Sequence, residues 1–244
     1  MAFAYPLSAT WTNVGARFRP VVPWQTLDRT RMKDGTEMTL ARRGEEHSIR
    51  IDGDVLMTSE SHGSEEKLAE RGCAGLEARP GARVLVGGLG MGFTARAALA
   101  VLRPDAAVDV VELVGAVVRW NRELIGHLAN APLLDPRVRV IEGDVADVIG
   151  AAREHYDAIL LDVDNGPEAF TFRENRDLYS REGLRRARNA LRPSGVLAIW
   201  STFESRAFTA RLRETGLETS LERVRANGRS KSVHSLWLGR RSHA

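Results

Sequence analysis

The chain has 244 residues, of which 43% are hydrophobic and 27% charged, with a formal net charge of +3. This composition is typical of a globular protein with one main domain. A single cysteine, Cys73, excludes an intrachain disulfide and a cysteine-rich metal site. No apolar run reaches the roughly 20 residues of a membrane helix, and no basic patch with interleaved aromatic residues indicates nucleic-acid binding. We therefore expect a cytoplasmic protein without membrane or nucleic-acid partners.

The N-terminal part of the chain predicts a small β unit. Residues 1–22 show no clear period. From residue 37 to residue 58, short apolar runs flank polar turns, and Asp52-Gly53 is a strong hairpin signal. We therefore expect an N-terminal extension with a small β-hairpin unit over residues 1–60. Ser64 then predicts the N-cap of a helix, with Glu65 and Glu66 in its first turn.

From residue 82 onward, apolar strand patterns alternate with amphipathic helix patterns, which predicts a parallel sheet with crossover helices. The predicted strands are 83–87, 108–113, 137–142, 157–162 and 195–200, and the predicted helices are 92–102, 115–128, 145–154, 176–191 and 205–215. The last two runs, 219–224 and 233–238, predict an antiparallel hairpin. We thus expect an α/β fold of the Rossmann-like type over residues 61–244.

A glycine-rich turn follows the first of these strands. Gly88, Gly90 and Gly92 alternate with other residues directly before a helix pattern. The spacing differs from the Gly-x-Gly-x-x-Gly fingerprint of dinucleotide sites. Three alternate glycines cost backbone entropy, and a close approach to a nucleotide-like ligand at the helix N-terminus would justify them. A tight strand–helix turn without a ligand is the alternative.

Acidic residues end three of the predicted strands, where open α/β sheets place their sites. Glu112 is placed to accept hydrogen bonds from ribose hydroxyls, and Asp144 from an adenine amino group; the alternatives are a solvated carboxylate and a helix N-cap. Asp162 begins a loop with Asp164 and Asn165. We interpret this loop as an acidic pocket for an amine, in which Asp162 orients the amine and accepts its proton. The alternative is a capped, solvated loop.

Three further kinds of residue have less specific patterns. The histidines share no metal-ligand spacing, so we expect no metal site. Tyr179 and Trp200 could line a pocket, but core packing is the favoured interpretation of both. Cys73 lies on the apolar face of its helix without an activating neighbour, which indicates a core residue.

The glycine turn, Glu112, Asp144 and Asp162, in this order and at these strand ends, resemble the class I S-adenosylmethionine-dependent methyltransferase fold. More specifically, residues 37–205 look like the spermidine synthase (polyamine aminopropyltransferase) branch. Shared stretches are Ile51-Asp52-Gly53, Asp135-Pro136-Arg137-Val138, Gly143-Asp144, Tyr156-Asp157 and Leu191-Arg192-Pro193-Ser194-Gly195-Val196-Leu197. The resemblance implies that Glu112 holds the nucleoside ribose, Asp144 the adenine and Asp162 the attacking amine. It also suggests a homodimer.

Several positions depart from that family. Leu56 and Met57 stand where the family usually has Gln, and Met91 stands where it has an acid inside the glycine turn. The helix at 64–70 lacks the family's Tyr and His, and the loop 162–167 is shorter. The nucleoside half of the site is therefore retained, and the polyamine half is rebuilt.

The resulting hypothesis is a transferase that moves an aminopropyl group from decarboxylated S-adenosylmethionine to an amine acceptor. The assigned catalytic residues are Asp162 and Asp164; the donor-binding residues are Gly88, Gly90, Gly92, Glu112, Asp144 and Asp162; the acceptor-binding residues are Asp164, Asn165, Met57 and Tyr179. An S-adenosylmethionine-dependent small-molecule methyltransferase and a nucleoside-binding, non-catalytic scaffold are the alternatives.

Overall fold

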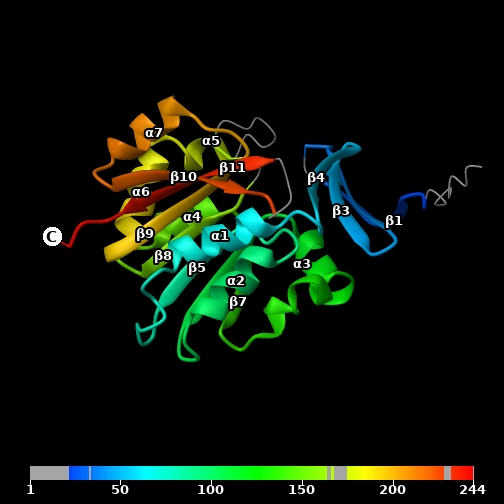
Figure 1. Ribbon diagram of the computed structural model, residues 1–244, viewed down its shortest axis with the longest axis horizontal. Helices are drawn as coiled ribbons and strands as arrows, with labels where there is room; N and C mark the ends of the chain where they lie inside the picture. The colour runs from blue at the N-terminus through cyan, green and yellow to red at the C-terminus, as the bar shows by residue number, and fades with distance from the viewer. Residues whose placement is uncertain (1–21, 33, 164–165, 168–174, 228–231, 244) are drawn as a thin grey trace, which may run out of the picture.

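The computed structural model describes residues 22–32, 34–163, 166–167, 175–227 and 232–243. Figure 1 shows two sheets, a four-stranded antiparallel sheet near the N-terminus and a seven-stranded, mainly parallel one. The first sheet contains β1 (Gln25–Arg31), β2 (Glu37–Arg43), β3 (Glu46–Ile51) and β4 (Asp54–Thr58), in that order. The predicted β unit at 37–58 is confirmed, and β1 adds a strand whose polar, largely exposed sequence carries no strand pattern.

The Asp52-Gly53 turn joins β3 to β4, as the sequence predicts. Both residues have positive φ, +48° and +92°, which is the conformation of a type I′ hairpin turn. Asp52 Oδ1 also accepts a hydrogen bond of 2.9 Å from the backbone N–H of Glu37. The turn therefore fixes both the hairpin and the start of the neighbouring strand.

The large sheet begins at residue 83 and carries the parallel strands that the sequence predicts. Its strands are β5 (Arg83–Gly87), β6 (Ala107–Glu112), β7 (Val138–Glu142), β8 (Tyr156–Leu161), β9 (Leu191–Ser201), β10 (Glu218–Arg225) and β11 (Val233–Arg240). Their order is β10-β11-β9-β8-β5-β6-β7. β5 to β9 are parallel, and the C-terminal hairpin β10–β11 adds antiparallel strands beside β9. The Rossmann-like α/β fold is thus confirmed.

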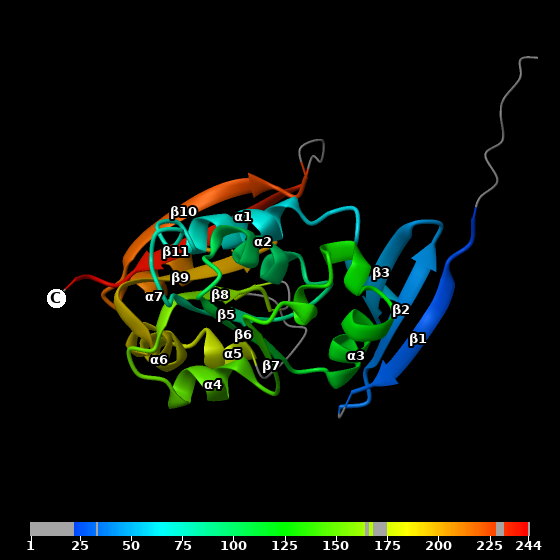
Figure 2. The same ribbon diagram turned by 90° about the horizontal axis from the view of Figure 1, so that it is seen from below.

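Helices cover both faces of this sheet (Figure 2). They are α1 (Gly63–Gly72), α2 (Phe93–Val101), α3 (Gly115–Glu123), α4 (Val145–Ala151), α5 (Asn175–Leu178), α6 (Arg181–Ala190) and α7 (Arg206–Arg213), with short 3-10 turns at Gly126–Ala129 and Pro132–Leu134. Side chains of α1, α2 and α3 belong to one core cluster, and side chains of α4, α6 and α7 to the other. Across the described part of the chain, every helix is too short or too polar to cross a bilayer.

The N-cap prediction for Ser64 is wrong. Helix α1 begins at Gly63 with His62 as its N-cap, and no side chain caps it. Gly63 starts the helix because its N–H donates to the carbonyl of Ala226 at 2.6 Å, at the end of β10. Ser64 therefore lies inside the first turn, where its hydroxyl is available for tertiary contacts.

The N-terminal sheet is attached to the larger fold through α3. Asp28 of β1 accepts hydrogen bonds of 2.7 Å from both Trp120 Nε1 and Arg119 Nη2, and Arg119 lowers the pKa of this carboxyl. Met38, Leu40 and Ile49 join the core cluster of the large sheet. Because the two sheets share a core, the division into residues 1–60 and 61–244 stays a prediction.

The glycine turn between β5 and α2 requires glycine for two reasons. Gly88, Gly90 and Gly92 all have positive φ, at +87°, +50° and +88°, where L-residues are strained. A Cβ on Gly88 would lie 2.2 Å from the carbonyl oxygen of Asp162, and one on Gly90 would lie 2.9 Å from Met57 Cε. At Gly88 the close approach is to backbone, whereas at Gly90 it is to the flexible end of a side chain, so the constraint is strictest at Gly88.

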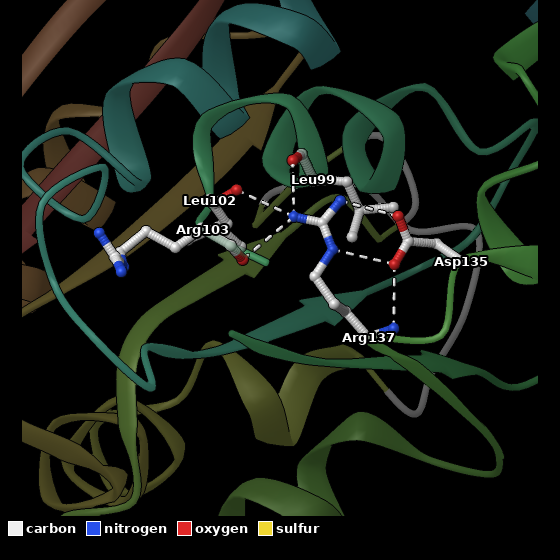
Figure 3. A network of polar contacts seen from close by, with 5 residues as sticks. All are labelled: Leu99, Leu102, Arg103, Asp135 and Arg137. Atoms are coloured by element: carbon white, nitrogen blue, oxygen red, sulfur yellow. Dashed lines mark hydrogen bonds and ion pairs between the residues drawn. The ribbon is translucent and has the colours of Figure 1, made fainter. Parts of the chain in front are cut away.

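Arg137 holds the other end of α2 (Figure 3). Its Nη1 donates to the carbonyl oxygens of Leu99, Leu102 and Arg103 at 3.0, 2.9 and 3.2 Å. Asp135 accepts from its Nε at 2.9 Å and from its Nη2 at 2.7 Å. A cation at the C-terminal carbonyls of a helix is stabilising, so Arg137 fixes the helix that begins at the glycine turn.

We expect Gly88→Ala to destabilise the fold more than Gly75→Ala does. Both glycines have nearly the same φ, +87° and +89°, but a Cβ on Gly75 meets nothing within 4 Å. Gly75→Ala should therefore lower the free energy of unfolding only by the backbone strain, about 1 kcal/mol. Gly88→Ala should lower it by roughly 2 kcal/mol more, because the new Cβ also clashes. Urea unfolding measures both, and equal losses would contradict the close approach.

We expect Arg137→Ala to lower the free energy of unfolding by about 2–3 kcal/mol, because several charge-assisted bonds to partly buried carbonyl groups at the end of α2 are lost. Arg103→Ala is the control, since Arg103 pairs with Asp105 at the surface and such pairs contribute roughly 0–1 kcal/mol. Guanidinium unfolding of both variants is the measurement. A loss for Arg137→Ala no larger than that of the control would show that the clamp is not stabilising.

Candidate active site

A cavity lies where the carboxyl ends of the parallel strands meet the N-terminal sheet. Its empty volume is about 990 Å³, open space at its mouth included. Gly88 and Gly90 of the glycine turn form part of its wall, and Met38, Ile49 and Met57 reach it from the N-terminal sheet. This is the crevice in which open α/β sheets bind their ligands.

The charged residues on the cavity wall are all acidic. Glu65, Glu112, Asp144 and Asp162 line it, and no Lys, Arg or His does so among the residues that the structure describes. Buried carboxylates without a cationic partner raise the free energy of the empty site. The cavity is therefore complementary to a ligand that carries positive charge.

Glu112, at the end of β6, is held by backbone donors. Its Oε2 accepts from the N–H of Leu89 at 2.9 Å, inside the glycine turn, and its Oε1 from the N–H of Val114 at 2.8 Å. Burial raises the pKa of this carboxyl, and these backbone hydrogen bonds partly oppose the rise. Each carboxylate oxygen retains a second lone pair for a ligand.

Asp144 lies beside Glu112 on the cavity wall, between β7 and α4. It is the N-cap of α4, and its Oδ1 accepts the N–H of Ala146 at 2.8 Å. The cap uses Oδ1 and fixes the orientation of the carboxylate, while the residue also lines the cavity. The N-cap role and a ligand-binding role are therefore compatible.

Asp162 follows β8 and faces the same cavity. Its backbone N–H donates to the carbonyl of Gly87 at 2.8 Å, and its Oδ2 accepts from Thr94 Oγ1 at 2.5 Å. Burial raises the pKa of the Asp162 carboxyl to about 6, against the Thr94 hydrogen bond, which lowers it. A carboxylate with such a pKa is suited to proton transfer near neutral pH.

Glu65 is the one acid among the described lining residues that was not assigned to the site from the sequence. It is only 6% exposed, and its Oε2 contacts Ser64 Oγ at 2.6 Å. Burial, with a smaller contribution from Asp162, raises the pKa of Glu65 to about 8. An acidic residue in a helix first turn is ordinarily exposed, so the local pattern pointed to a helix-dipole role. The signal that could have found Glu65 is its place in the segment that matches the polyamine-binding helix of the resembled family.

The other assigned residues are distributed differently. Met57 and Trp200 line the cavity. Gly92 is the N-cap of α2 and packs toward Pro132. Tyr179 packs edge-on against Phe208 in the second core cluster, with ring centroids 5.8 Å apart. Asp164 and Asn165 lie outside the described residues.

Met91, which replaces an acid of the resembled family, is fully buried in the first core cluster. Its side chain is therefore part of the hydrophobic core beneath the glycine turn. Within the described segments, no group of three or more His, Cys, Asp or Glu is arranged as a metal site.

Comparison with known proteins identifies the family. The family model described as the spermine/spermidine synthase domain matches residues 72–214. Putrescine N-methyltransferase 2 of Nicotiana attenuata is 36% identical over 128 residues, which are 48% of this chain and 32% of that protein. Polyamine aminopropyltransferase 1 of Streptomyces coelicolor is 30% identical over 156 residues, 62% of this chain and 27% of that protein.

The matched segments thus span about a third of these curated relatives. Among solved structures, spermidine synthase from Thermotoga maritima superposes with a TM-score of 0.71 at 16% identity, over 90% of this chain and 74% of that one. This likeness supports the fold, while the family model covers more than half of the sequence. The chain therefore belongs to the spermine/spermidine synthase family, as the glycine turn and the three strand-end acids indicate.

Proposed function

We propose that this chain is a transferase that moves an aminopropyl group from decarboxylated S-adenosylmethionine to an amine acceptor. The observation that carries the proposal is the acidic cavity beside the glycine turn, whose described wall contains four carboxylates and no basic residue. Both proposed substrates are cations near neutral pH, so burial of each one relieves repulsion among these carboxylates.

The donor half of the cavity is formed by Gly88, Gly90, Glu112 and Asp144. A purine and ribose need a flat, close approach to backbone, and at Gly88 and Gly90 a Cβ would already clash with the protein itself. We assign the remaining lone pairs of Glu112 to the ribose hydroxyls and Asp144 Oδ2 to the adenine amino group. Gly92 supports this half indirectly, as the N-cap of α2.

The acceptor half is formed around Asp162. Its carboxylate orients the amine and accepts one proton from the ammonium form, which leaves the nitrogen lone pair free. That lone pair forms a bond to the carbon next to sulfur, the carbon–sulfur bond breaks, and its electron pair returns to sulfur as a neutral thioether. The described residues then contribute chiefly alignment and exclusion of water. Asp164 and Asn165 are assigned to the acceptor from the sequence alone.

Transfer of a methyl group from intact S-adenosylmethionine is the second candidate. Two observations favour it: relatives at 36% identity are named putrescine N-methyltransferases, and Met91 puts a buried thioether where an acid is expected to hold the aminopropyl end. The relatives' names also support a diamine or similar polyamine as the acceptor in either reaction.

We expect decarboxylated S-adenosylmethionine to bind at least about tenfold more tightly than S-adenosylmethionine. The carboxylate of the intact donor would face an acidic wall without a described basic partner, and a penalty of 1.4 kcal/mol already gives this factor. Isothermal titration calorimetry with both donors is the test. Methylthioadenosine, which lacks the charged tail, reports the nucleoside half alone. Equal or tighter binding of intact S-adenosylmethionine would contradict aminopropyl transfer and favour methyl transfer.

We expect Asp162→Asn to lower kcat roughly 10²–10⁴-fold, the usual contribution of a positioned base. Donor affinity should fall by a much smaller factor, because Glu65, Glu112 and Asp144 remain on the cavity wall. Wild-type kcat should fall as pH drops below about 6, because the raised pKa of Asp162 places its protonation there, and this limb should vanish in the variant. Asp105→Asn, at an exposed surface pair, is the control. Unchanged turnover in Asp162→Asn would remove the base assignment. If the wild type binds the donor but turns over no amine, the protein is a nucleoside-binding, non-catalytic scaffold.

A further inference from the structure

Glu65 is a second buried acid in the cavity, and the mechanism above gives it no role. It projects from the first turn of α1 and shares the cavity wall with Asp162. Burial without a cationic partner is costly for a carboxylate. The buried position of Glu65 is therefore not explained by the packing of α1, and its hydrogen-bond partners indicate what else it does.

The partner of Glu65 is a hydroxyl at the centre of three contacts. Ser64 Oγ lies 2.6 Å from Glu65 Oε2, 2.8 Å from His234 Nδ1 and 3.0 Å from Trp200 Nε1. The indole N–H of Trp200 can only donate, and a hydroxyl donates one hydrogen. The proton on Ser64 therefore points either to Glu65 or to His234, and the two alternatives correspond to different proton positions in the cluster.

With Glu65 ionised, Ser64 donates to Glu65 and His234 donates from Nδ1. With Glu65 protonated, Glu65 donates to Ser64, and Ser64 donates to a bare Nδ1, which leaves the imidazole proton on Nε2. Every contact remains satisfied in both arrangements. Moving one proton from Glu65 to Ser64, and the Ser64 proton to Nδ1, converts the second arrangement into an ionised Glu65 beside an imidazolium. Loss of the Nε2 proton then regenerates the first arrangement.

The positions of the three residues suit a path from the cavity outward. Glu65 lines the cavity, Ser64 is fully buried, and His234 on β11 is partly exposed. The bond from Gly63 N–H to the Ala226 carbonyl holds the start of α1 against the C-terminal hairpin. Residues 170 positions apart in the chain are brought together in this way.

We propose that Glu65, Ser64 and His234 form a proton relay that carries the proton released by the acceptor amine from the cavity to the surface. The inference rests on the proposed function, in which an ammonium becomes a substituted ammonium and a sulfonium becomes a neutral thioether, so that each turnover releases one proton. Asp162 takes this proton from the acceptor, Glu65 receives it, and Ser64 and His234 pass it outward. Each transfer breaks one O–H or N–H bond and forms another, with no other reactant.

The charged neighbours favour the first transfer, from Asp162 to Glu65. Glu65 faces Asp162 in the cavity and has Glu66 beside it, and both raise its pKa. Glu66 is itself paired with His62 and with Arg96 of α2. Around His234, the edge of the Trp200 ring packs at 4.7 Å between centroids, and burial lowers the pKa of this imidazole. The step from Glu65 through Ser64 to His234 is therefore uphill, and the imidazolium is a transient species that loses its Nε2 proton outward.

The first test needs no substrate. In the ¹⁵N NMR spectrum of the wild type, we expect His234 to carry its proton on Nε2 at pH 7 and on Nδ1 well above pH 8, because the pKa of Glu65 is raised to about 8. In Glu65→Gln this tautomer switch should be absent. A tautomer independent of pH in the wild type, or the same switch in Glu65→Gln, would overturn the relay.

The second test uses turnover with the donor that calorimetry selects. We expect Ser64→Ala and His234→Ala to lower kcat about tenfold or more, with donor affinity unchanged, and imidazole in the buffer to restore kcat in His234→Ala. His155→Ala is the matched control, since His155 is also partly buried with a lowered pKa but packs on Tyr156 away from the cavity. Loss of kcat that imidazole does not restore would assign His234 a structural role and overturn the relay. A wild type that transfers no group would refute the proposed function, whereas the NMR experiment judges the relay by itself.

Discussion

The architecture of the cavity depends on backbone hydrogen bonds that tie three strand ends to the glycine turn. Gly88 N–H donates to the Val111 carbonyl and Leu89 N–H to the Glu112 carboxylate, while Asp162 N–H donates to the Gly87 carbonyl. Strands β5, β6 and β8 are thus joined at one point. A side chain at Gly88 would clash with the Asp162 carbonyl at this point. The cavity wall beside it combines the glycine backbone and the acids with apolar side chains such as Met57, Val145 and Trp200. Arg137 completes this arrangement from the far end of α2.

The electrostatic design of the cavity follows from that rigidity. Its acids are held in place by backbone N–H groups and hydroxyls and not by cationic side chains. Their negative charge is therefore not neutralised within the described protein, and the pKa values of Glu65, Glu112 and Asp162 are raised. A cationic ligand and the ionised acids stabilise one another. Binding of a cationic ligand is consequently linked to proton release from these carboxyl groups.

Much of this structure could be predicted from the sequence because the informative residues are local. Continuous apolar runs predicted β5 to β9, and Asp52-Gly53 predicted its hairpin. Glu112, Asp144 and Asp162 could be located since the end of a parallel strand fixes its position at the sheet edge. β1 escaped prediction because a polar, exposed edge strand has no hydrophobic period to recognise.

The Ser64 cluster could not be predicted for a different physical reason. Its members come from α1, β9 and β11, and only the tertiary pairing of β11 with β9 brings His234 to Trp200 and Ser64. The local signal even favoured another role, since a serine followed by two glutamates resembles a helix N-cap. The true start of the helix was set by a bond from Gly63 to a distant strand. Likewise, the burial of Met91 depends on core packing rather than on its position in the motif.

The indole of Trp200 has a consequence for observing this protein in solution. Its ring forms part of the cavity wall, and its Nε1–H is bonded to the Ser64 hydroxyl. Indole emission is sensitive to hydrogen bonding at this nitrogen and to the polarity around the ring. Among the other described tryptophans, Trp120 and Trp237 are fully buried elsewhere in the core, and Trp24 stacks with Arg43 and Arg50 of the N-terminal sheet. The chain therefore carries an intrinsic fluorophore at the junction of its cavity and its buried polar cluster. Its share of the emission of the five tryptophans is the part that depends on the state of the site.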